Sequence, residues 1–183
     1  MKNLLENSPI IAAVKSIEDL EAALLSDIDI IFLLFGSILT ISNLSELIEK
    51  HNKIGIIHMD LIDGLQPKDA TIKYLVKTTK FRGIISTKHQ LIKSAKENGL
   101  FTIQRIFIYD TLSLNNATTH ISAYCDALEV LPGVIPKVIK KIHQSTKKPV
   151  IAGGLIEEKD EAIRALNQGA IAISTTKQKM WKI

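Results

Sequence analysis

The stretches Pro149-Val-Ile-Ala-Gly-Gly-Leu155 and Gly169-Ala-Ile-Ala-Ile-Ser-Thr-Thr176 share one pattern. Each begins with an apolar run of strand length and ends in glycine or hydroxyl residues. The segment between them, 157–168, has helical periodicity and stops at a glycine, a residue that commonly ends helices. A strand, a helix and a second strand in this order place the two strands parallel and close together. We therefore expect the ends of the two stretches to meet in space.

The same alternation of apolar runs and helix-like segments extends over the whole chain. Before the two stretches, the expected strands are 10–14, 30–35, 54–59, 83–85, 101–107 and 127–131. The expected helices are 16–25, capped by Ser16, 43–51, with Glu46 in a capping box, 68–77, 88–98, 113–122, 136–145 and 157–168. Strict alternation predicts an α/β protein with a parallel sheet covered by helices. Eight strands predict a compact, closed (β/α)8 TIM barrel.

No linker or break in composition divides the chain, so we expect residues 1–183 to form a single TIM-barrel domain. The chain is short beside the usual barrel of about 250 residues. Only Lys-Gln-Lys-Met-Trp-Lys-Ile follows Thr176, which leaves room for a truncated last helix of one or two turns. Trp181 then either packs on its own barrel or anchors a second subunit in a homo-oligomer.

Composition indicates an ordinary globular protein. Hydrophobic residues make up 46% of the 183 residues, and the formal net charge is +4. A mildly basic chain permits contact with nucleic acid or anionic metabolites without requiring either. Cys125 is the single cysteine, so no disulfide forms within the chain. The first residues are too polar for a signal peptide, and the apolar run 28–34 is too short to span a membrane. We expect a cytoplasmic protein that does not contact membranes.

The residues that end the two quoted stretches are candidates for binding a phosphate. Gly153 and Gly154 let backbone amides approach a ligand closely, and Ser174 and Thr175 add hydroxyl donors. The loops after the last two strands of a (β/α)8 barrel are a frequent phosphate site. The simpler alternative is that the glycines form only a tight turn and that the hydroxyls only cap a helix. The coincidence of both elements favours the phosphate site.

Five charged residues follow other strands and should surround the same end of the barrel. They are Lys15, Asp60, Lys88, Arg105 and Glu129. In one interpretation they bind the polyol part of a small phosphorylated ligand, since carboxylates accept hydrogen bonds from hydroxyls. In a second they are catalytic, with a lysine forming a Schiff base or the carboxylates acting as an acid/base pair. In a third, Arg105 and Glu129 form a structural ion pair inside the barrel.

A metal site is a weaker alternative. Asp60, Asp63 and Glu129 are of the type that binds Mg²⁺. The sequence lacks the dense spacing of a metal site, so we expect no metal.

Two groups of basic residues are candidates for contacting RNA. The first is Lys137, Lys140, Lys141, Lys147 and Lys148, and the second is Lys73, Lys77, Lys80 and Arg82. Each group is either an RNA-binding stripe or a solvated helix face, and sequence alone favours the solvated face. No motif of a known RNA-binding module is present, and aromatic residues make up only 5% of the chain. The sequence does not identify the RNA-binding residues.

Taken together, the motifs resemble the glycerol-3-phosphate-responsive antiterminator family over about residues 9–181. The segments that carry the resemblance are Pro9-Ile-Ile-Ala-Ala-Val-Lys15, Phe32-Leu-Leu-Phe-Gly36, His58-Met-Asp-Leu-Ile-Asp-Gly64, Gly83-Ile-Ile-Ser-Thr-Lys88, Thr102-Ile-Gln-Arg-Ile-Phe107, Glu129-Val-Leu-Pro-Gly133, Ile151-Ala-Gly-Gly-Leu-Ile156 and Ala170-Ile-Ala-Ile-Ser-Thr175. The resemblance implies a barrel without catalytic activity or cofactor that binds glycerol 3-phosphate as effector. It also implies binding to leader mRNA of glycerol-utilisation genes, so that a terminator is bypassed and the transcript is protected.

Carried over by position, the resemblance assigns the phosphate to the glycine and hydroxyl residues and the polyol to the five charged residues named above. The alternative function is a TIM-barrel enzyme that acts on a small phosphate ester, of the isomerase, aldolase or phosphodiesterase type.

Overall fold

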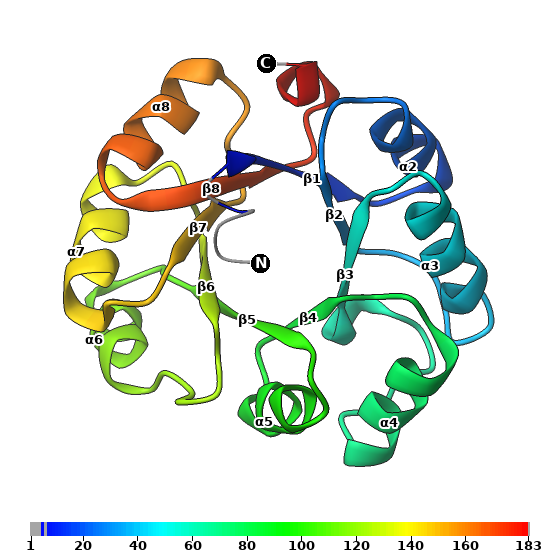
Figure 1. Cartoon of the computed structure of the whole chain (residues 1–183). Coiled ribbons are helices and arrows are strands. Elements are labelled where there is room, and N and C mark those ends of the chain that lie inside the picture. The colour runs from blue at the N-terminus through cyan, green and yellow to red at the C-terminus, as the bar shows by residue number, and fades with distance from the viewer. Residues whose placement is uncertain (1–4, 6, 183) are drawn as a thin grey trace.

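Eight parallel strands close into a barrel in the computed structural model of the chain, and their spatial order is their sequence order (Figure 1). The structure describes residues 5 and 7–182. The strands are β1 (Ile10–Val14), β2 (Ile30–Leu33), β3 (Ile54–His58), β4 (Gly83–Ser86), β5 (Phe101–Phe107), β6 (Ala127–Leu131), β7 (Val150–Gly153) and β8 (Ala170–Thr175). β8 pairs with β1, where Ile11 lies opposite Ser174, and this pairing closes the ring. The predicted (β/α)8 TIM barrel is confirmed.

In the described part of the chain, seven α-helices surround the barrel, one after each of the first seven strands (Figure 1). They are α2 (Ile17–Leu24), α3 (Ile41–Lys50), α4 (Asp69–Thr78), α5 (His89–Glu97), α6 (Thr111–Thr119), α7 (Pro136–Thr146) and α8 (Lys159–Asn167). Two short 3-10 helices, η1 (Met59–Leu61) and η2 (Gln178–Lys182), follow β3 and β8. None of the helices in the described part of the chain is both long and apolar enough to cross a membrane.

Alternation along the strands sorts their side chains into two cores. Residues such as Ile56, Ile103 and Ala172 fill the inside of the barrel, together with Leu5 from before β1. Their sequence neighbours face outward and pack against the helices. Ile103 and Ala127 lie inside, so the residues two positions further along, Arg105 and Glu129, project from the same side at the carboxyl end of the barrel.

The N-cap side chain makes a capping hydrogen bond at the start of α2 but not at the start of α3. Ser16 accepts a hydrogen bond from the amide of Asp19, as predicted for α2. The capping box predicted around Glu46 is wrong, because α3 begins earlier, at Ile41. Its N-cap residue Thr40 uses its hydroxyl in the preceding turn, where it accepts from the amide of Ser37 at 3.0 Å.

The helix after β8 is short, as predicted, and it packs on the outside of the barrel. η2 packs beside β1 and α2, and its Trp181 is 2% exposed. The indole Nε1 donates to the carbonyl oxygen of Thr175 at 3.0 Å. Trp181 therefore packs on its own barrel, and the alternative that it anchors a second subunit is wrong.

Candidate ligand-binding site

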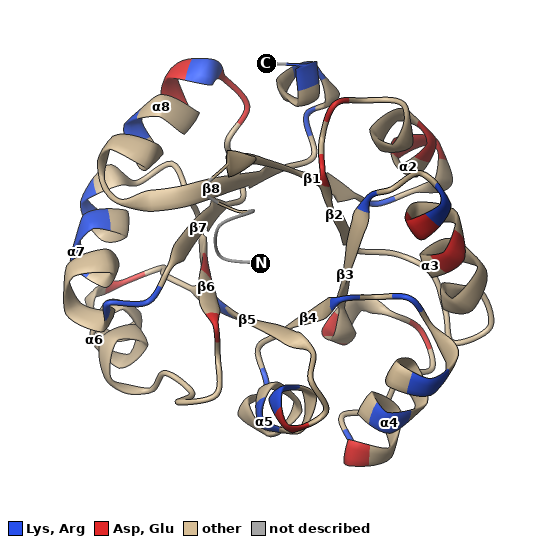
Figure 2. Cartoon of the chain, viewed as in Figure 1, with Lys and Arg blue, Asp and Glu red and all other residues tan. Residues whose placement is uncertain are grey.

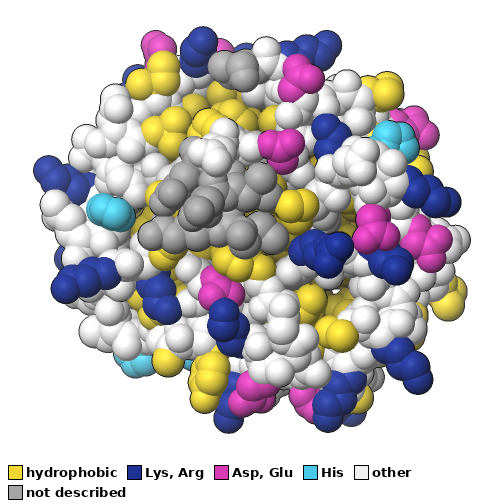
Figure 3. Space-filling view, in the orientation of Figure 1, with side chains coloured by type: hydrophobic (Ala, Val, Ile, Leu, Met, Phe, Trp, Pro, Cys, Tyr) yellow, Lys and Arg dark blue, Asp and Glu magenta, His cyan; other side chains and the backbone are white. Residues whose placement is uncertain are grey.

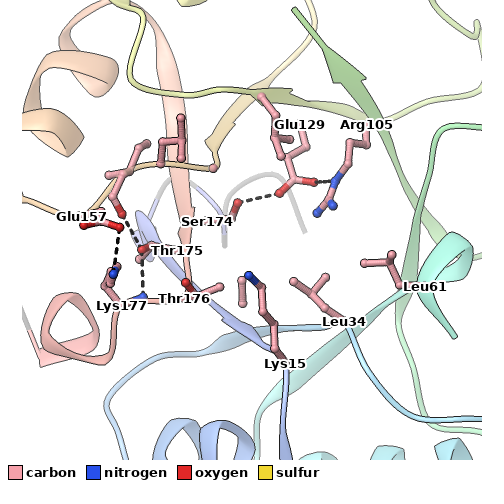
Figure 4. Close-up of a pocket in the computed structure, with 15 residues that line it drawn as sticks. Lys15, Leu34, Leu61, Arg105, Glu129, Glu157, Ser174, Thr175, Thr176 and Lys177 are labelled. Atoms are coloured by element: carbon pink, nitrogen blue, oxygen red, sulfur yellow. Dashed lines mark hydrogen bonds and ion pairs between the residues drawn. The ribbon is translucent and has the colours of Figure 1, made fainter.

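The tips of β7 and β8 meet, as the two quoted stretches predicted. Gly153 lies opposite Ser174 in the parallel ladder. A pocket of about 520 Å³ opens beside them at the carboxyl ends of the strands (Figure 4). Its lining residues come from six of the eight strands or the loops that follow them, and from η1: Ala13, Lys15, Leu34, Leu61, Arg105, Glu129, Leu131, Gly154, Leu155, Ile156, Glu157, Ser174, Thr175, Thr176 and Lys177. The carboxyl end of a barrel is where such folds bind their ligands.

A buried carboxylate organises one wall of this pocket (Figure 4). Glu129 is 1% exposed, and its Oε2 accepts from Nε of Arg105 at 2.7 Å. Its other oxygen, Oε1, accepts from the hydroxyl of Ser174 at 2.6 Å. A carboxylate out of water is tolerated only with such partners. The predicted ion pair inside the barrel is therefore present, and it forms part of the pocket lining.

Glycine is required beside this network. A Cβ atom added at Gly153 would lie 2.5 Å from Oγ of Ser174 and 2.8 Å from Oε1 of Glu129. Both distances are shorter than any ordinary van der Waals contact, so a side chain at this position would displace the hydrogen-bonded groups. The first glycine of the pair thus allows the serine and the glutamate to approach the β7 backbone.

The loop after β7 has an unusual backbone. Gly154 and the following Leu155 have φ values of +73° and +62°. A leucine in the left-handed region is uncommon, and such conformations gather at functional sites. Within the described part of the chain, the amides of Gly154, Leu155 and Thr176 donate no hydrogen bond. These amides, at the tips of β7 and β8, are available to an anion.

The two predicted hydroxyl donors are already engaged within the protein. Ser174 donates to Glu129, and Thr175 donates to the carbonyl oxygen of Ile156 at 2.8 Å while it accepts from the amide of Lys177. Thr175 therefore joins the β7 and β8 loops, because its hydroxyl bonds to both. In this arrangement the donors that remain for a phosphate are the main-chain amides of the two loops.

Lys15 supplies positive charge to the pocket. It follows β1, its own amide donates to the Asp19 carboxylate, and its ammonium group points into the cavity toward Ser174 (Figure 4). Beside it, after the neighbouring strand β8, Lys177 pairs with Glu157 at 2.9 Å. Sequence reasoning named Lys15 but missed Leu155, Glu157, Thr176 and Lys177. Their position directly after the two quoted strands was the available signal.

Asp60 and Lys88 belong to a neighbouring cluster and do not line the pocket. The carboxylate of Asp60 accepts from the Ser86 hydroxyl and from the amide and hydroxyl of Thr87. Lys88 lies 3.8 Å from the same carboxylate. Burial raises the pKa of Asp60, but the hydrogen bonds from Thr87 and Ser86 outweigh it, so the pKa lies below its usual value. The five charged residues thus fall into two groups, one in the pocket wall and one between β3 and β4.

His58 is the most isolated polar side chain of the barrel interior. It is 2% exposed, and neither ring nitrogen has a hydrogen-bond partner among the described residues. Burial, and then the positive charge of Arg105, lower its pKa from 6.5 to about 4. The imidazole is therefore neutral at pH 7, a weak base with one free donor and one free acceptor.

The carboxylates considered for Mg²⁺ do not come together. In the described ranges no group of three His, Cys, Asp or Glu side chains has the arrangement of a metal site. Asp63 instead bridges to Ser37 through its backbone, in the loops after β2 and β3. Among the described residues, these three carboxylates therefore do not converge on one point.

Comparison with known proteins agrees with the motifs. Residues 10–181 match the family model described as glycerol-3-phosphate responsive antiterminator. The uncharacterized protein YgcP of Escherichia coli is 38% identical over 99% of this chain and 95% of its own length.

Two solved structures are also similar. The glycerol uptake operon antiterminator regulatory protein of Listeria monocytogenes superposes with a TM-score of 0.91 at 33% identity, over 96% of this chain and 95% of that one. The antiterminator-related protein of Thermotoga maritima gives a TM-score of 0.85 at 31% identity, over 96% and 99% of the two chains.

Proposed function

This chain belongs to the glycerol-3-phosphate responsive antiterminator family, and we propose that it is a cytoplasmic sensor of glycerol 3-phosphate that regulates transcripts rather than an enzyme. In this proposal it binds the leader mRNA of glycerol-utilisation genes, so that transcription passes a terminator and the transcript is stabilised. Glycerol 3-phosphate is the effector, and no cofactor is needed.

The observation that carries the proposal is the pocket between the tips of β7 and β8. Its volume of about 520 Å³ suits a small ligand and its first hydration waters. The amides of Gly154, Leu155 and Thr176, which have no acceptor among the described residues, supply donors for phosphate oxygens, and the ammonium group of Lys15 supplies the opposite charge. A doubly charged ester satisfies all of these groups at once.

The glycerol part of the ligand has partners in the same wall. Arg105 and Glu129 line the pocket, and a hydroxyl group can bond to a guanidinium or a carboxylate without a change in charge. We therefore assign Lys15, Arg105 and Glu129 to the ligand. Asp60 instead forms an ion pair with Lys88 and accepts a hydrogen bond from the amide of Thr87. These contacts hold the loop after β4 in place.

Effector control requires that the ligand favours one of two states. Glycerol 3-phosphate shifts the protein toward the RNA-binding state only to the extent that it binds that state more tightly. The β7 and β8 loops suit this role, because the ligand would bridge amides from both. The RNA affinity is then expected to rise with ligand concentration.

The ligand claim is tested by thermal unfolding at increasing concentrations of glycerol 3-phosphate, with glycerol and inorganic phosphate as separate controls. We expect the ester to raise Tm in a saturable manner, glycerol to have no effect and phosphate to act only weakly. At a ligand concentration of 100 Kd the stabilisation should reach about 2.7 kcal/mol. An unchanged Tm at millimolar ester would contradict the proposal.

The RNA claim is tested separately by filter binding to the leader RNA of a glycerol operon, at several salt concentrations with and without the ester. We expect tighter binding with the ester present, and weaker binding as salt increases, because phosphate contacts release counterions. Equal affinity in both conditions would exclude effector control.

A second candidate is an enzyme that converts a small phosphate ester. One observation favours it: Lys15 and the buried Glu129 line the pocket at the end of the barrel where catalytic barrels hold their reactive groups. Recovery of unchanged glycerol 3-phosphate after long incubation supports the sensor. Isomerisation, cleavage or hydrolysis of the ester, lost on Lys15→Met, would support the enzyme.

A further inference from the structure

The outer face of α7 carries positive charge and has no acidic residue of its own. Lys137, Lys140 and Lys141 are spaced by one helical turn and are exposed, whereas Val138, Ile139 and Ile142 on the other face are buried. No Asp or Glu occurs between Glu129 and Glu157 in the sequence. None of the ion pairs between described residues involves a lysine of α7.

On α4 and α5, lysines lie near acidic residues of the same helix. Lys73 of α4 pairs with Asp69, and Lys93 of α5 lies 3.9 Å from Glu97, so these faces carry both signs of charge. The contrast is visible in Figure 2, where α7 carries blue segments without red ones. The left edge of Figure 3, over α7, likewise shows lysine or arginine and histidine side chains without acidic ones.

The neighbouring helix α6 extends this face without adding charge. Residues 111–125 contain no Asp, Glu, Lys or Arg, and α6 packs beside α7. Nζ of Lys141 donates to the side-chain oxygen of Asn115 at 3.4 Å, which joins the two helices on their outer side. The result is one surface of amides, hydroxyls and ammonium groups, with the exposed carboxylate of Asp110, the N-cap residue of α6, at its edge.

Exposed aromatic and apolar side chains border this surface at the carboxyl end of the barrel. Tyr109 is 84% exposed, Leu112 is 66% exposed and Phe107 is 52% exposed. Leu112 lies in the first turn of α6 and Tyr109 just before it, whereas Phe107 ends β5 on the inner side, with Arg105. Aromatic rings held open to solvent beside lysines are the usual means of binding single-stranded nucleic acid, because bases stack on them while ammonium groups contact phosphates.

We propose that single-stranded leader RNA docks on this α6–α7 surface, defined by Tyr109, Lys137, Lys140 and Lys141. The inference rests on the proposed function and adds where the RNA lies. A base stacks on Tyr109, and the RNA backbone follows the lysines along α7. The lysines span about one helical turn, so they contact a short run of phosphates.

The position of the surface also explains how the ligand would control it. Strand β5 carries Arg105 to the wall of the ligand pocket and ends at Phe107, which alternation turns to the same inner side. Tyr109 follows in the loop between β5 and α6. A ligand that engages Arg105 therefore acts on the strand that leads to Tyr109.

RNA fits this surface better than a protein partner does. Lysine is depleted from protein interfaces, and a surface with three unpaired lysines in one turn would require a matching acidic partner. RNA supplies a negative charge at every phosphate, whatever its sequence. The exposed apolar groups, Leu112 and the rings of Tyr109 and Phe107, lie at one end and do not form a broad apolar patch.

The first test replaces Lys137, Lys140 and Lys141 with glutamine. We expect leader RNA to bind at least about tenfold more weakly at moderate salt, with the slope of log K against log salt shallower by about 2, since each lost contact to a single strand removes about 0.7. The control replaces Lys73, Lys77 and Lys80 with glutamine, which gives the same change in net charge on the α4 side. It should leave the slope unchanged.

The second test is Tyr109→Ala, which should weaken RNA binding about tenfold without changing the salt slope, because it removes stacking but no charge. Tyr109→Phe should restore the affinity. Sedimentation of both variants without RNA checks the alternative partner. If Tyr109→Ala changes the mass of the protein instead of its RNA affinity, the surface contacts a second copy and the proposal is wrong.

The outcomes separate this proposal from the proposed function. A wild-type protein that does not bind leader RNA contradicts the function itself. Wild-type binding that the α7 variant retains, or that the α4 control loses equally, contradicts only the location. In every variant, an unchanged rise of Tm with glycerol 3-phosphate confirms that the fold and the ligand pocket are intact.

Discussion

Glu129 shows how much one side chain contributes to both stability and binding. Its buried carboxylate balances Arg105 and orients Ser174. We expect Glu129→Leu to lower the free energy of unfolding by about 3–5 kcal/mol, because it leaves the guanidinium buried without a partner. Adding Arg105→Met should restore most of this loss while ligand binding stays absent. Urea unfolding of both variants measures the effect, and a double variant no more stable than the single one would argue against it.

His58 gives the protein a dependence on pH in a defined window. Its pKa is about 4 in the folded protein and near 6.5 when unfolded, so between these values only the unfolded chain binds the proton. The free energy of unfolding should therefore be constant above about pH 7 and fall by roughly 2 kcal/mol between pH 7 and pH 5.

The variant that isolates this effect is His58→Leu, which also removes two ring nitrogens without partners. Its stability should be equal to or above that of the wild type at pH 7, and it should change much less between pH 7 and pH 5. Urea midpoints at both pH values measure the difference. Parallel decreases in the two proteins would show that other groups cause the pH dependence.

Among the elements, η2 is short but contributes a large buried side chain. Its Trp181 fills the space beside β1 and donates to the carbonyl oxygen of Thr175. We expect Trp181→Ala to cost about 3–5 kcal/mol, since it creates a cavity and leaves a buried carbonyl oxygen without its donor. Lys182→Ala, at an exposed position of the same element, should cost less than about 0.5 kcal/mol.

The elements were largely predictable from the sequence because a parallel strand buried on both faces is a run of apolar residues. The pattern located all eight strands. It missed the start of α6, which begins at Thr111 because Asp110 accepts a hydrogen bond from the amide of Ser113. It placed the start of α3 too late, since the hydroxyl of Thr40 accepts a hydrogen bond within the turn after β2 and gives no capping signal. Both errors arise in loops, where side chains bond to nearby backbone and the hydrophobic period gives no information.

The barrel as a whole depends on the pairing of its first and last strands. Without β8, both β1 and β7 lose a hydrogen-bonded neighbour and the sheet stays open. We expect a chain that ends at Gln168 to show no sharp urea transition by circular dichroism. A chain that ends at Thr176 keeps β8 and loses only η2, so it should unfold cooperatively at a lower urea concentration. Cooperative unfolding of the shorter chain would contradict the dependence on closure.

The pocket was partly predictable at the level of the whole molecule. Topology alone placed the tips of β7 and β8 together, and alternation brought Arg105 and Glu129 to the same end. Neither could show that Asp60 is held by Ser86 and Thr87, because that depends on how the loops after β3 and β4 fold. Nor could they show the positive φ of Leu155, since leucine gives no signal of it.

The indole of Trp181 is the single tryptophan of the chain, and it bonds to a residue that lines the ligand pocket. The protein thus contains one indole fluorophore, one hydrogen bond away from the cavity. Its emission offers a label-free signal for following ligand entry on the millisecond time scale. Because no second indole contributes background, any spectral change on mixing reports the neighbourhood of the β8 tip alone.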